Sequence, residues 1–382
     1  MKKNKRKRII PHGWKEIKIS DVFETSSGST PTASKQEYYE NGDIPWINSG
    51  ELAKPYIYRT NNFITKEGYD NSSTKMYPID TVLVAMYGAT AGKASILKME
   101  ACTNQAVCAI LPNPDYDPLF IKYSIDTLYD YLVGLSTGSA RDNLSQAGIK
   151  DLKLIVPNSL KEQKQLASVL ATLDKKITLN RQINDNLEAQ LRLITSRYIF
   201  SCPNLEKKRI GEIATVKAGG DCPITFSKTR TRKCNIPIFS NGTEDRGLYG
   251  FTNKAKIEGH SITVAARGTI GYCERRLMPF VPIIRLLAIT PKEDGAYIYL
   301  HQVIRGMKFN KNGSVQQQLT VPEISFIEIP YPHSGILHEY NNVASPIVEM
   351  IERNISENEI LTKQRDELLP LLMNGQASVN SD

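Results

Sequence analysis

Short apolar runs alternate with long heptad-like stretches, and this alternation occurs twice along the chain. Val82–Ala85 and Ile262–Ala265 are β-branched, apolar runs that predict buried strands, each followed by a glycine turn. Leu152–Pro157 and Phe326–Pro330 are predicted strands closed by proline, which cannot continue a β-ladder. After each of these prolines the apolar period lengthens to about 3.5 residues, which predicts a long helix.

The first long helix is predicted after Ser159, which stands at capping-box spacing from Glu162. Neither glycine nor proline interrupts the chain from there to Ile199. The residues at seam spacing are Leu173, Ile177, Asn180, Asn184, Leu187 and Leu191.

The second helix is predicted to have Ser345 as its N-cap, Pro346 in its first turn, and Gly375 as its stop. Pro370 is expected to bend or fray its last turn. Its seam comprises Ile347, Ile351, Asn358, Leu361 and Leu368.

Two seams in one chain most simply pack on each other as an antiparallel coiled coil, with the asparagines fixing the register. A helix of about 32 residues is about 48 Å long. Such a pair would hold the globular halves at opposite ends, farther apart than one turn of B-DNA at ~34 Å. The alternative is that both helices are core helices of a bundle.

Sequence blocks recur in the same order in both halves and indicate a duplication. The matched pairs are 19–22 with 210–213, 44–50 with 236–242, 82–92 with 262–271, and 138–144 with 313–319. The predicted fold is α+β, with two duplicated mixed α/β domains separated by the two helices. The expected boundaries are 1–158 (with a basic arm at 1–10), 159–201, 202–332 and 333–382.

Charge is distributed unevenly over the 382 residues, whose formal net charge is +8. Residues 14–157 carry a net −4, whereas residues 207–330 carry a net +9. A basic block of this kind favours a polyanionic partner, most often nucleic acid. Simple solubility is the alternative explanation.

Candidate nucleic-acid contacts follow from this chemistry. Lys228, Arg230, Arg232 and Lys233 lie within six residues and suit phosphate binding, and an arginine could also reach a guanine edge. The alternative is a solvated loop.

The glycine turns are a second group of candidates, because a turn without side chains can admit a DNA backbone closely. Tyr87 and Lys93 flank one turn, and Arg267 and Thr269 belong to the other. Ser139 and Arg141 could position phosphate or fix the junction between domain and helix. An ordinary tight turn is the alternative for both glycine sites.

Enzymatic signatures are sparse in this sequence. It contains no P-loop, G-x-G-x-x-G, H-E-x-x-H or G-x-S-x-G motif. Asp115, Asp151 and Lys153 fit a nuclease-like pattern only loosely, and we expect no metal site there. The six cysteines lack zinc-ligand spacing, which predicts free thiols. No apolar run predicts a membrane span or a signal sequence, so we expect a cytoplasmic protein.

Several motifs in their order resemble the specificity subunit of type I restriction–modification enzymes. They are Pro11-His12-Gly13-Trp14 with Ile19–Val22, Thr103-Asn104-Gln105-Ala106-Val107, the 137–145 segment Thr-Gly-Ser-Ala-Arg-Asp-Asn-Leu-Ser, Glu162-Gln163, and 368–375. The resemblance covers nearly the whole chain. The second half departs from it, since Gly313–Gln316 lacks the arginine found at 141, and Glu339-Tyr340 replaces Glu162-Gln163.

This resemblance implies two target recognition domains, each reading half of a split sequence in double-stranded DNA. It implies that the helices set the spacing and dock two modification subunits, with restriction/translocase subunits joining them. The chain itself would be non-catalytic and bind no cofactor or metal. S-adenosylmethionine, ATP and Mg would be bound by the partner subunits. The alternatives are a protein-binding coiled-coil scaffold without DNA specificity and a stand-alone DNA-modifying enzyme.

Overall fold

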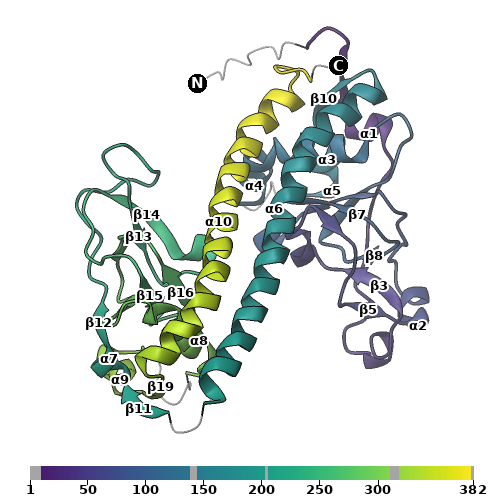
Figure 1. Ribbon diagram of the computed structural model, residues 1–382. Helices are drawn as coiled ribbons and strands as arrows, with labels where there is room; N and C mark the ends of the chain where they lie inside the picture. Colours follow the sequence, from purple (N-terminus) through teal and green to yellow (C-terminus); the bar gives the residue numbers. More distant parts are fainter. Residues whose placement is uncertain (1–9, 138–143, 203–204, 310–317, 380–382) are drawn as a thin grey trace. The chain divides into compact units, whose positions relative to one another are not determined.

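The computed structural model describes residues 10–137, 144–202, 205–309 and 318–379 (Figure 1). The chain forms two compact units. Unit 1 extends to Leu179 and also includes the residues from Glu357 onward, and unit 2 comprises Asn180–Ser356. Two long helices, α6 (Leu160–Thr195) and α10 (Ser334–Met373), each contribute residues to both units.

Unit 1 is built on three sheets. The five-stranded sheet has the order β2 (Thr25–Ser27), β9 (Val107–Ile110), β6 (Val82–Ala85), β7 (Ala94–Leu97) and β4 (Tyr56–Ile57). The three-stranded sheet has the order β5 (Phe63–Ile64), β3 (Ile44–Ile47) and β8 (Cys102–Thr103), and β1 (Trp14–Lys18) pairs with β10 (Lys153–Pro157). Its short helices are α1 (Ile19–Val22), α2 (Lys66–Asp70), α3 (Pro118–Asp126), α4 (Tyr129–Thr137) and α5 (Gln146–Lys150), with 3₁₀ turns η1 (Gln36–Tyr38), η2 (Ser49–Ala53) and η3 (Gly88–Thr90).

Unit 2 repeats this plan. Its four-stranded sheet has the order β12 (Ala214–Ala218), β18 (Leu287–Pro291), β15 (Ser261–Val264) and β16 (Cys273–Arg276). The three-stranded sheet has the order β14 (Leu248–Thr252), β13 (Ile236–Phe239) and β17 (Val281–Pro282), and β11 (Glu206–Arg209) pairs with β19 (Glu328–Tyr331). Its shorter helical elements are the π-helical turn η4 (Ser196–Phe200), α7 (Ile210–Ile213), the 3₁₀ turn η5 (Glu244–Gly247), α8 (Ala296–Gly306) and α9 (Val321–Phe326).

The duplication inferred from sequence is visible in the strand pairing. In unit 1, β3 pairs in parallel with β8, placing Trp46 opposite Cys102. In unit 2, β13 pairs in parallel with β17, placing Ile238 opposite Val281. An antiparallel strand, β5 or β14, flanks the other side of each pair.

Strand β6 shows why the predicted apolar run is continuous. Val82 and Val84 pack into the cluster that contains α3, whereas Leu83 and Ala85 belong to a separate cluster on the opposite face. A strand buried on both faces needs apolar residues at every position. The prediction at Phe326–Pro330 was too long, because Phe326 ends α9 and the strand begins at Glu328.

The long helices run antiparallel within each unit, as predicted. In unit 1, Arg365 pairs with Asp174 at 3.0 Å and Glu357 pairs with Lys176 at 3.5 Å. In unit 2, Asn354 donates to the Asn184 side chain at 2.8 Å. The seam residues Ile177, Asn180, Leu191 and Ile351 are buried, and the partly buried ones are Leu173, Asn184, Leu187, Ile347, Asn358, Leu361 and Leu368.

The predicted start of the second helix at Pro346 was wrong. α10 begins at Ser334, and Pro346 lies inside it. Leu337, Tyr340, Ala344 and Val348 are buried in the core of unit 2 at helical spacing. This burial offsets the lost backbone hydrogen bond, which makes an interior proline costly by about 3 kcal/mol.

The predicted stop at Gly375 and the predicted cap at Ser159 were correct, although the Glu162 carboxylate accepts from Trp14 Nε1 at 3.2 Å rather than completing a capping box, and α10 continues past Pro370 to Met373. Gly375 follows the end of α10 with a φ of +67°, and the Gln376 N–H donates to the Leu371 carbonyl at 2.8 Å. At the start of α6 the Ser159 hydroxyl accepts from the Glu162 N–H at 3.4 Å. Among the described residues, no helix is both long and apolar enough to cross a membrane.

Candidate nucleic-acid interface

Four loops meet at one end of the sheets in unit 1, which we call loop end 1: residues 28–30, 48–49, 87–92 and 103–106. Gly28 has no space for a side chain, since a Cβ there would lie 1.8 Å from the Thr103 carbonyl oxygen. The Ser29 N–H donates to that same carbonyl at 3.0 Å, and the Thr30 hydroxyl donates to Gln105 Oε1 at 2.5 Å. The Thr103–Gln105 motif is therefore a structural centre of this loop cluster.

The side chain of Asn104 joins two further loops. Its Nδ2 donates to Asn48 Oδ1 at 3.1 Å, and its Oδ1 accepts from the Ala106 N–H at 3.2 Å. The Ala106 carbonyl in turn accepts from the Met86 N–H at 2.8 Å, immediately before the glycine turn. The cluster thus fixes the position of that turn by hydrogen bonds.

Tyr87, just before the glycine turn, is exposed to solvent, whereas Lys93, just after it, packs against an aromatic ring. Gly88 and Gly92 have φ values of +79° and +81°, which explains the two glycines. The Tyr87 side chain is 46% exposed. Lys93 Nζ lies 4.1 Å from the centre of the Tyr129 ring, a cation–π contact.

Unit 2 has an equivalent cluster, loop end 2, formed by residues 219–220, 240–242, 266–271 and 283–285. Asn241 joins its loops by donating to the Ile284 carbonyl at 2.6 Å and accepting from the Ala266 N–H at 2.8 Å. Arg267 and Thr269 are exposed in this turn. The Arg267 guanidinium is already engaged, because its Nη2 and Nε donate to Gln318 Oε1 at 2.6 and 3.0 Å.

The four clustered cations lie on a loop anchored at both ends, and all of them are exposed. Ser227 exchanges two backbone hydrogen bonds with Phe251 on β14, at 2.9 and 2.8 Å. At the far end, the Thr231 hydroxyl accepts from the Cys234 N–H at 2.9 Å. None of the four cations of this loop forms an ion pair with a described residue; they are Lys228, Arg230, Arg232 and Lys233.

Ser139 and Arg141 lie outside the described residues, as does the arm at 1–9. The structure thus places the remaining candidates at two loop clusters and one anchored loop.

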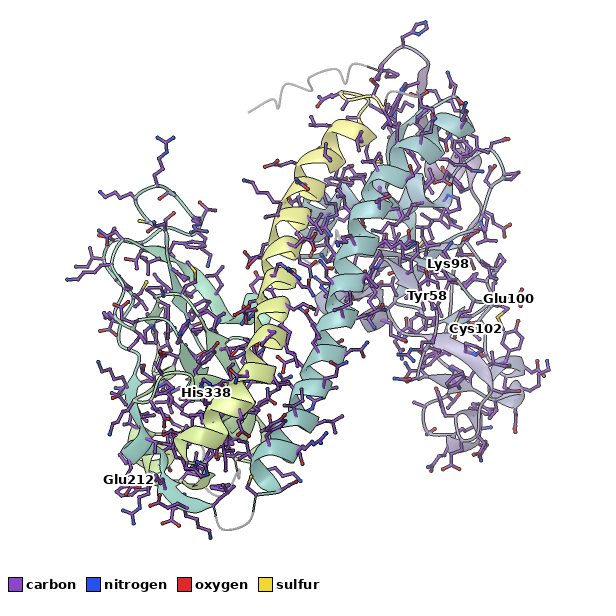
Figure 2. All side chains as sticks on the ribbon, viewed as in Figure 1. Tyr58, Lys98, Glu100, Cys102, Glu212 and His338 are labelled. Carbon is purple, nitrogen blue, oxygen red and sulfur yellow. The ribbon has the colours of Figure 1, made fainter. Side chains whose placement is uncertain are left out.

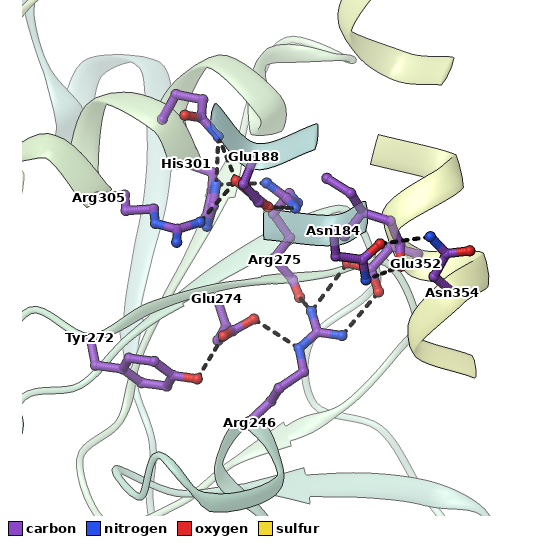
Figure 3. Close-up of polar contacts among 12 residues, drawn as sticks. Asn184, Glu188, Arg246, Tyr272, Glu274, Arg275, His301, Arg305, Glu352 and Asn354 are labelled. Atoms are coloured by element: carbon purple, nitrogen blue, oxygen red, sulfur yellow. Dashed lines mark hydrogen bonds and ion pairs between the residues drawn. The ribbon is translucent and has the colours of Figure 1, made fainter. Parts of the chain in front are cut away.

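Sequence reasoning missed a network of charges that joins the sheet of unit 2 to its helices (Figure 3). Arg246, at φ +56°, pairs with Glu274 on β16 at 2.8 Å and with Glu352 on α10 at 3.0 Å. Burial alone would raise the pKa of Glu274, but Arg246 and the Tyr272 hydroxyl outweigh it, and the pKa is lowered.

A second part of this network surrounds Glu188 on α6. Its carboxylate accepts from Arg275 and, at 2.9 Å, from Arg305. Arg275 also donates to His301 Nδ1 at 2.9 Å. Burial and the nearby arginines hold the pKa of His301 well below its ordinary value.

Two residues of the loose nuclease-like pattern are ion-paired to other residues. Asp151 pairs with Lys18 at 2.8 Å, and Lys153 pairs with Glu16 at 2.8 Å. The described part of the chain holds no group of three His, Cys, Asp or Glu side chains suited to a metal. The cysteine thiols are free, and Cys102 is buried on β8 (Figure 2).

Comparisons with known proteins agree with this geometry. A family model described as the type I restriction modification DNA specificity domain matches residues 11–189 and 204–369. The MjaIX specificity subunit of Methanocaldococcus jannaschii, a type I restriction enzyme subunit, is 26% identical over 97% of this chain and 95% of its own. A putative type I specificity subunit of Mycoplasma pneumoniae is 28% identical over 72% of this chain and 88% of its own.

A solved structure shares the fold. The type I restriction–modification S subunit from M. genitalium aligns with a TM-score of 0.60 and 17% identity, covering 98% of both chains.

Proposed function

The chain belongs to the family of type I restriction–modification DNA specificity domains, and from this premise we propose that it is the sequence-reading subunit of such a complex. Each unit would read one part of a bipartite target in double-stranded DNA. The single observation that carries this proposal is the presence of two matched loop ends on two copies of one fold, together with an anchored and exposed cationic loop in unit 2.

The hydrogen bonding of each loop end supports a reading role. Asn104 follows β8 and Asn241 follows β13, so they come from different loops, but each joins neighbouring loops to a glycine turn whose neighbouring side chains are exposed. Rigid loops can hold side chains in register with base edges, whereas the exposed cations would contact phosphate and set the orientation.

The long helices would set the spacing of the two half-sites. α6 has 36 residues, which corresponds to about 54 Å, and this exceeds one helical turn of B-DNA. Their exposed faces would dock two modification subunits, with restriction/translocase subunits joining the complex. The boundaries we assign to the reading domains are 1–158 and 202–332, and to the helical regions 159–201 and 333–382.

The chemistry of modification would belong to the partners. We assign no catalytic residue to this chain and expect S-adenosylmethionine, ATP and Mg to be bound by the partner subunits. The residues we assign to DNA contact are Tyr87, Lys93, Ser139, Arg141, Lys228, Arg230, Arg232, Lys233, Arg267 and Thr269. Such a complex would act in the cytoplasm, where bacterial and archaeal DNA is found.

The test is a genome-wide map of methyladenine in the source cell, with and without this gene. Loss of one motif with two short defined halves and a fixed gap is the expected result, and it would also reveal the target. An unchanged map, with the modification subunits shown to be expressed, would overturn the proposal and favour a protein-binding scaffold.

A further inference from the structure

An apolar ridge stands on the surface of unit 2 beside the cationic loop. We define the ridge as Ile224, Phe226, Leu248 and Tyr249. Ile224 is 105% exposed, so no described residue covers it, and the other three are 37–41% exposed. Single exposed apolar residues are common on protein surfaces, but four of them on two paired segments, two with their rings in contact, call for a partner.

Strand β14 supports the aromatic part of the ridge. The rings of Phe226 and Tyr249 contact each other with centres 5.6 Å apart. Phe226 lies directly over Gly250, where a Cβ would come within 2.4 Å of the ring. Glycine at this position is therefore what allows the ring to lie on the strand.

Hydrogen bonds on both sides of Phe226 hold the segment that carries the ridge. The Thr252 hydroxyl donates to the Thr225 carbonyl at 2.7 Å, and Ser227 pairs with Phe251 through two backbone hydrogen bonds. Ile224 directly precedes these anchors. Its exposed side chain therefore projects from a backbone segment that hydrogen bonds hold in place.

The charge around the ridge indicates its partner. Lys228 Nζ lies 4.9 Å from the centre of the Tyr249 ring, and Arg230, Arg232 and Lys233 follow within five residues. An apolar surface rimmed by cations on one side matches the stacked bases and flanking phosphates of a nucleic acid. Apolar side chains such as isoleucine and phenylalanine can insert between base pairs and unstack them.

We propose that Ile224 inserts between two base pairs of the second half-site, and that the Phe226–Tyr249 pair supports it. The adjacent Lys228, Arg230 and Arg232 would hold the phosphates of the kinked strand. This inference rests on the proposed function and adds a mechanism of reading through DNA deformability, which depends on the sequence of the kinked step.

Unit 1 differs in the segment that corresponds to the one carrying Ile224 and Phe226. Between β2 and β3, residues 28–43 expose no large apolar side chain, and Tyr38 within them is 3% exposed, so that Phe63 on β5, which is 38% exposed, has no exposed apolar neighbour from this segment. The kink is therefore assigned to the second half-site alone.

The experiment uses the full chain with its modification subunits and a duplex that carries the methylated motif. 2-Aminopurine replaces one base at a time through both half-sites, except at the adenines that are methylated. We expect increased fluorescence at one step of the second half-site on binding. Ile224→Ala should abolish this increase and weaken binding roughly tenfold, whereas Ile224→Leu should retain both.

Phe326→Ala is the matched control. Phe326 is 65% exposed and ends α9, whose label lies at the opposite end of unit 2 from that of β14 in Figure 1. It should leave binding and fluorescence unchanged. A fluorescence increase that persists in Ile224→Ala would overturn the proposal that Ile224 inserts between base pairs. The absence of any fluorescence increase in the wild-type complex would overturn it as well. Loss of sequence-specific binding by the wild-type complex, measured separately, would instead mean that the proposed function is wrong.

Discussion

Arg246 and Glu352 form a two-pronged ion pair in unit 2, with Nη1–Oε2 and Nη2–Oε1 distances of 3.0 and 3.1 Å. Arg246 precedes β14, the strand that carries Leu248 and Tyr249, whereas Glu352 lies on α10. The pair therefore ties the base of the apolar ridge to a long helix. Arg246 Nη2 also donates to the Arg275 carbonyl at 3.1 Å, so the guanidinium is held from several sides.

Glu352→Ala should destabilise unit 2 by about 2 kcal/mol, because it removes one partner of a largely buried arginine. Hydrogen exchange of the β14 and β16 amides would report this change. Glu367→Ala is the control on the same helix, since Glu367 forms an exposed pair with Lys363 at 3.9 Å and should change stability by less than about 0.5 kcal/mol. Equal exchange rates in the wild type and Glu352→Ala would contradict the prediction.

Unit 2 should lose stability as the pH falls below about 6.5. Burial, first, and then Arg275 and Arg305 lower the pKa of His301, so the folded chain keeps the ring neutral while the unfolded chain binds a proton. Urea unfolding at pH 7.5 and pH 5.5 measures this difference. His301→Gln should reduce the pH dependence, whereas the exposed His338→Gln (Figure 2) should keep it. An identical pH dependence in all three proteins would exclude His301 as its source.

Arg230→Ala and Arg232→Ala should weaken DNA binding by the assembled complex. A loss of about 1–3 kcal/mol with relaxed choice at one base of the second half-site would indicate a base contact. A uniform loss with a shallower salt dependence would indicate a phosphate contact. Titrations at several salt concentrations separate the two results, and no change in either variant would remove this loop from the interface.

Gly28→Ala should destabilise unit 1 by about 3 kcal/mol, because the new methyl group would overlap the Thr103 carbonyl. Gly50→Ala is the matched control, since no atom lies within 4 Å of its Cβ position. Thermal unfolding, together with hydrogen exchange of the β8 and β9 amides, would measure the difference in stability between the two variants. If both variants were equally stable, the close approach of Gly28 to Thr103 would not exist in solution.

Local patterns predicted the elements whose burial is continuous in sequence. The β6 and β15 runs and the duplicated 44–50 and 236–242 blocks could be found because each strand carries its own apolar signal. The start of α10 could not be placed correctly because Pro346 is a strong local signal. The buried stripe from Leu337 to Val348 outweighs that signal only through tertiary packing.

The ionic network was not predictable for a different reason. Glu188, Arg246 and His301 have partners far away in sequence, and charged residues show no periodicity that marks them as buried. The cationic loop was found because its charges are adjacent. The apolar ridge was missed because its members come from two segments that only the sheet brings together.

The divided membership of α10 has a consequence for the order in which the protein folds during synthesis. Leu372 and Met373 are buried in the same core as β1 and α3, so the core of unit 1 is completed by residues that are made at least 212 positions after Leu160, the first residue of α6. Unit 2 comes from one continuous stretch of chain. Unit 1 begins to emerge from the ribosome first, but it reaches its final packing last. By then all of unit 2 has been made and is available to fold.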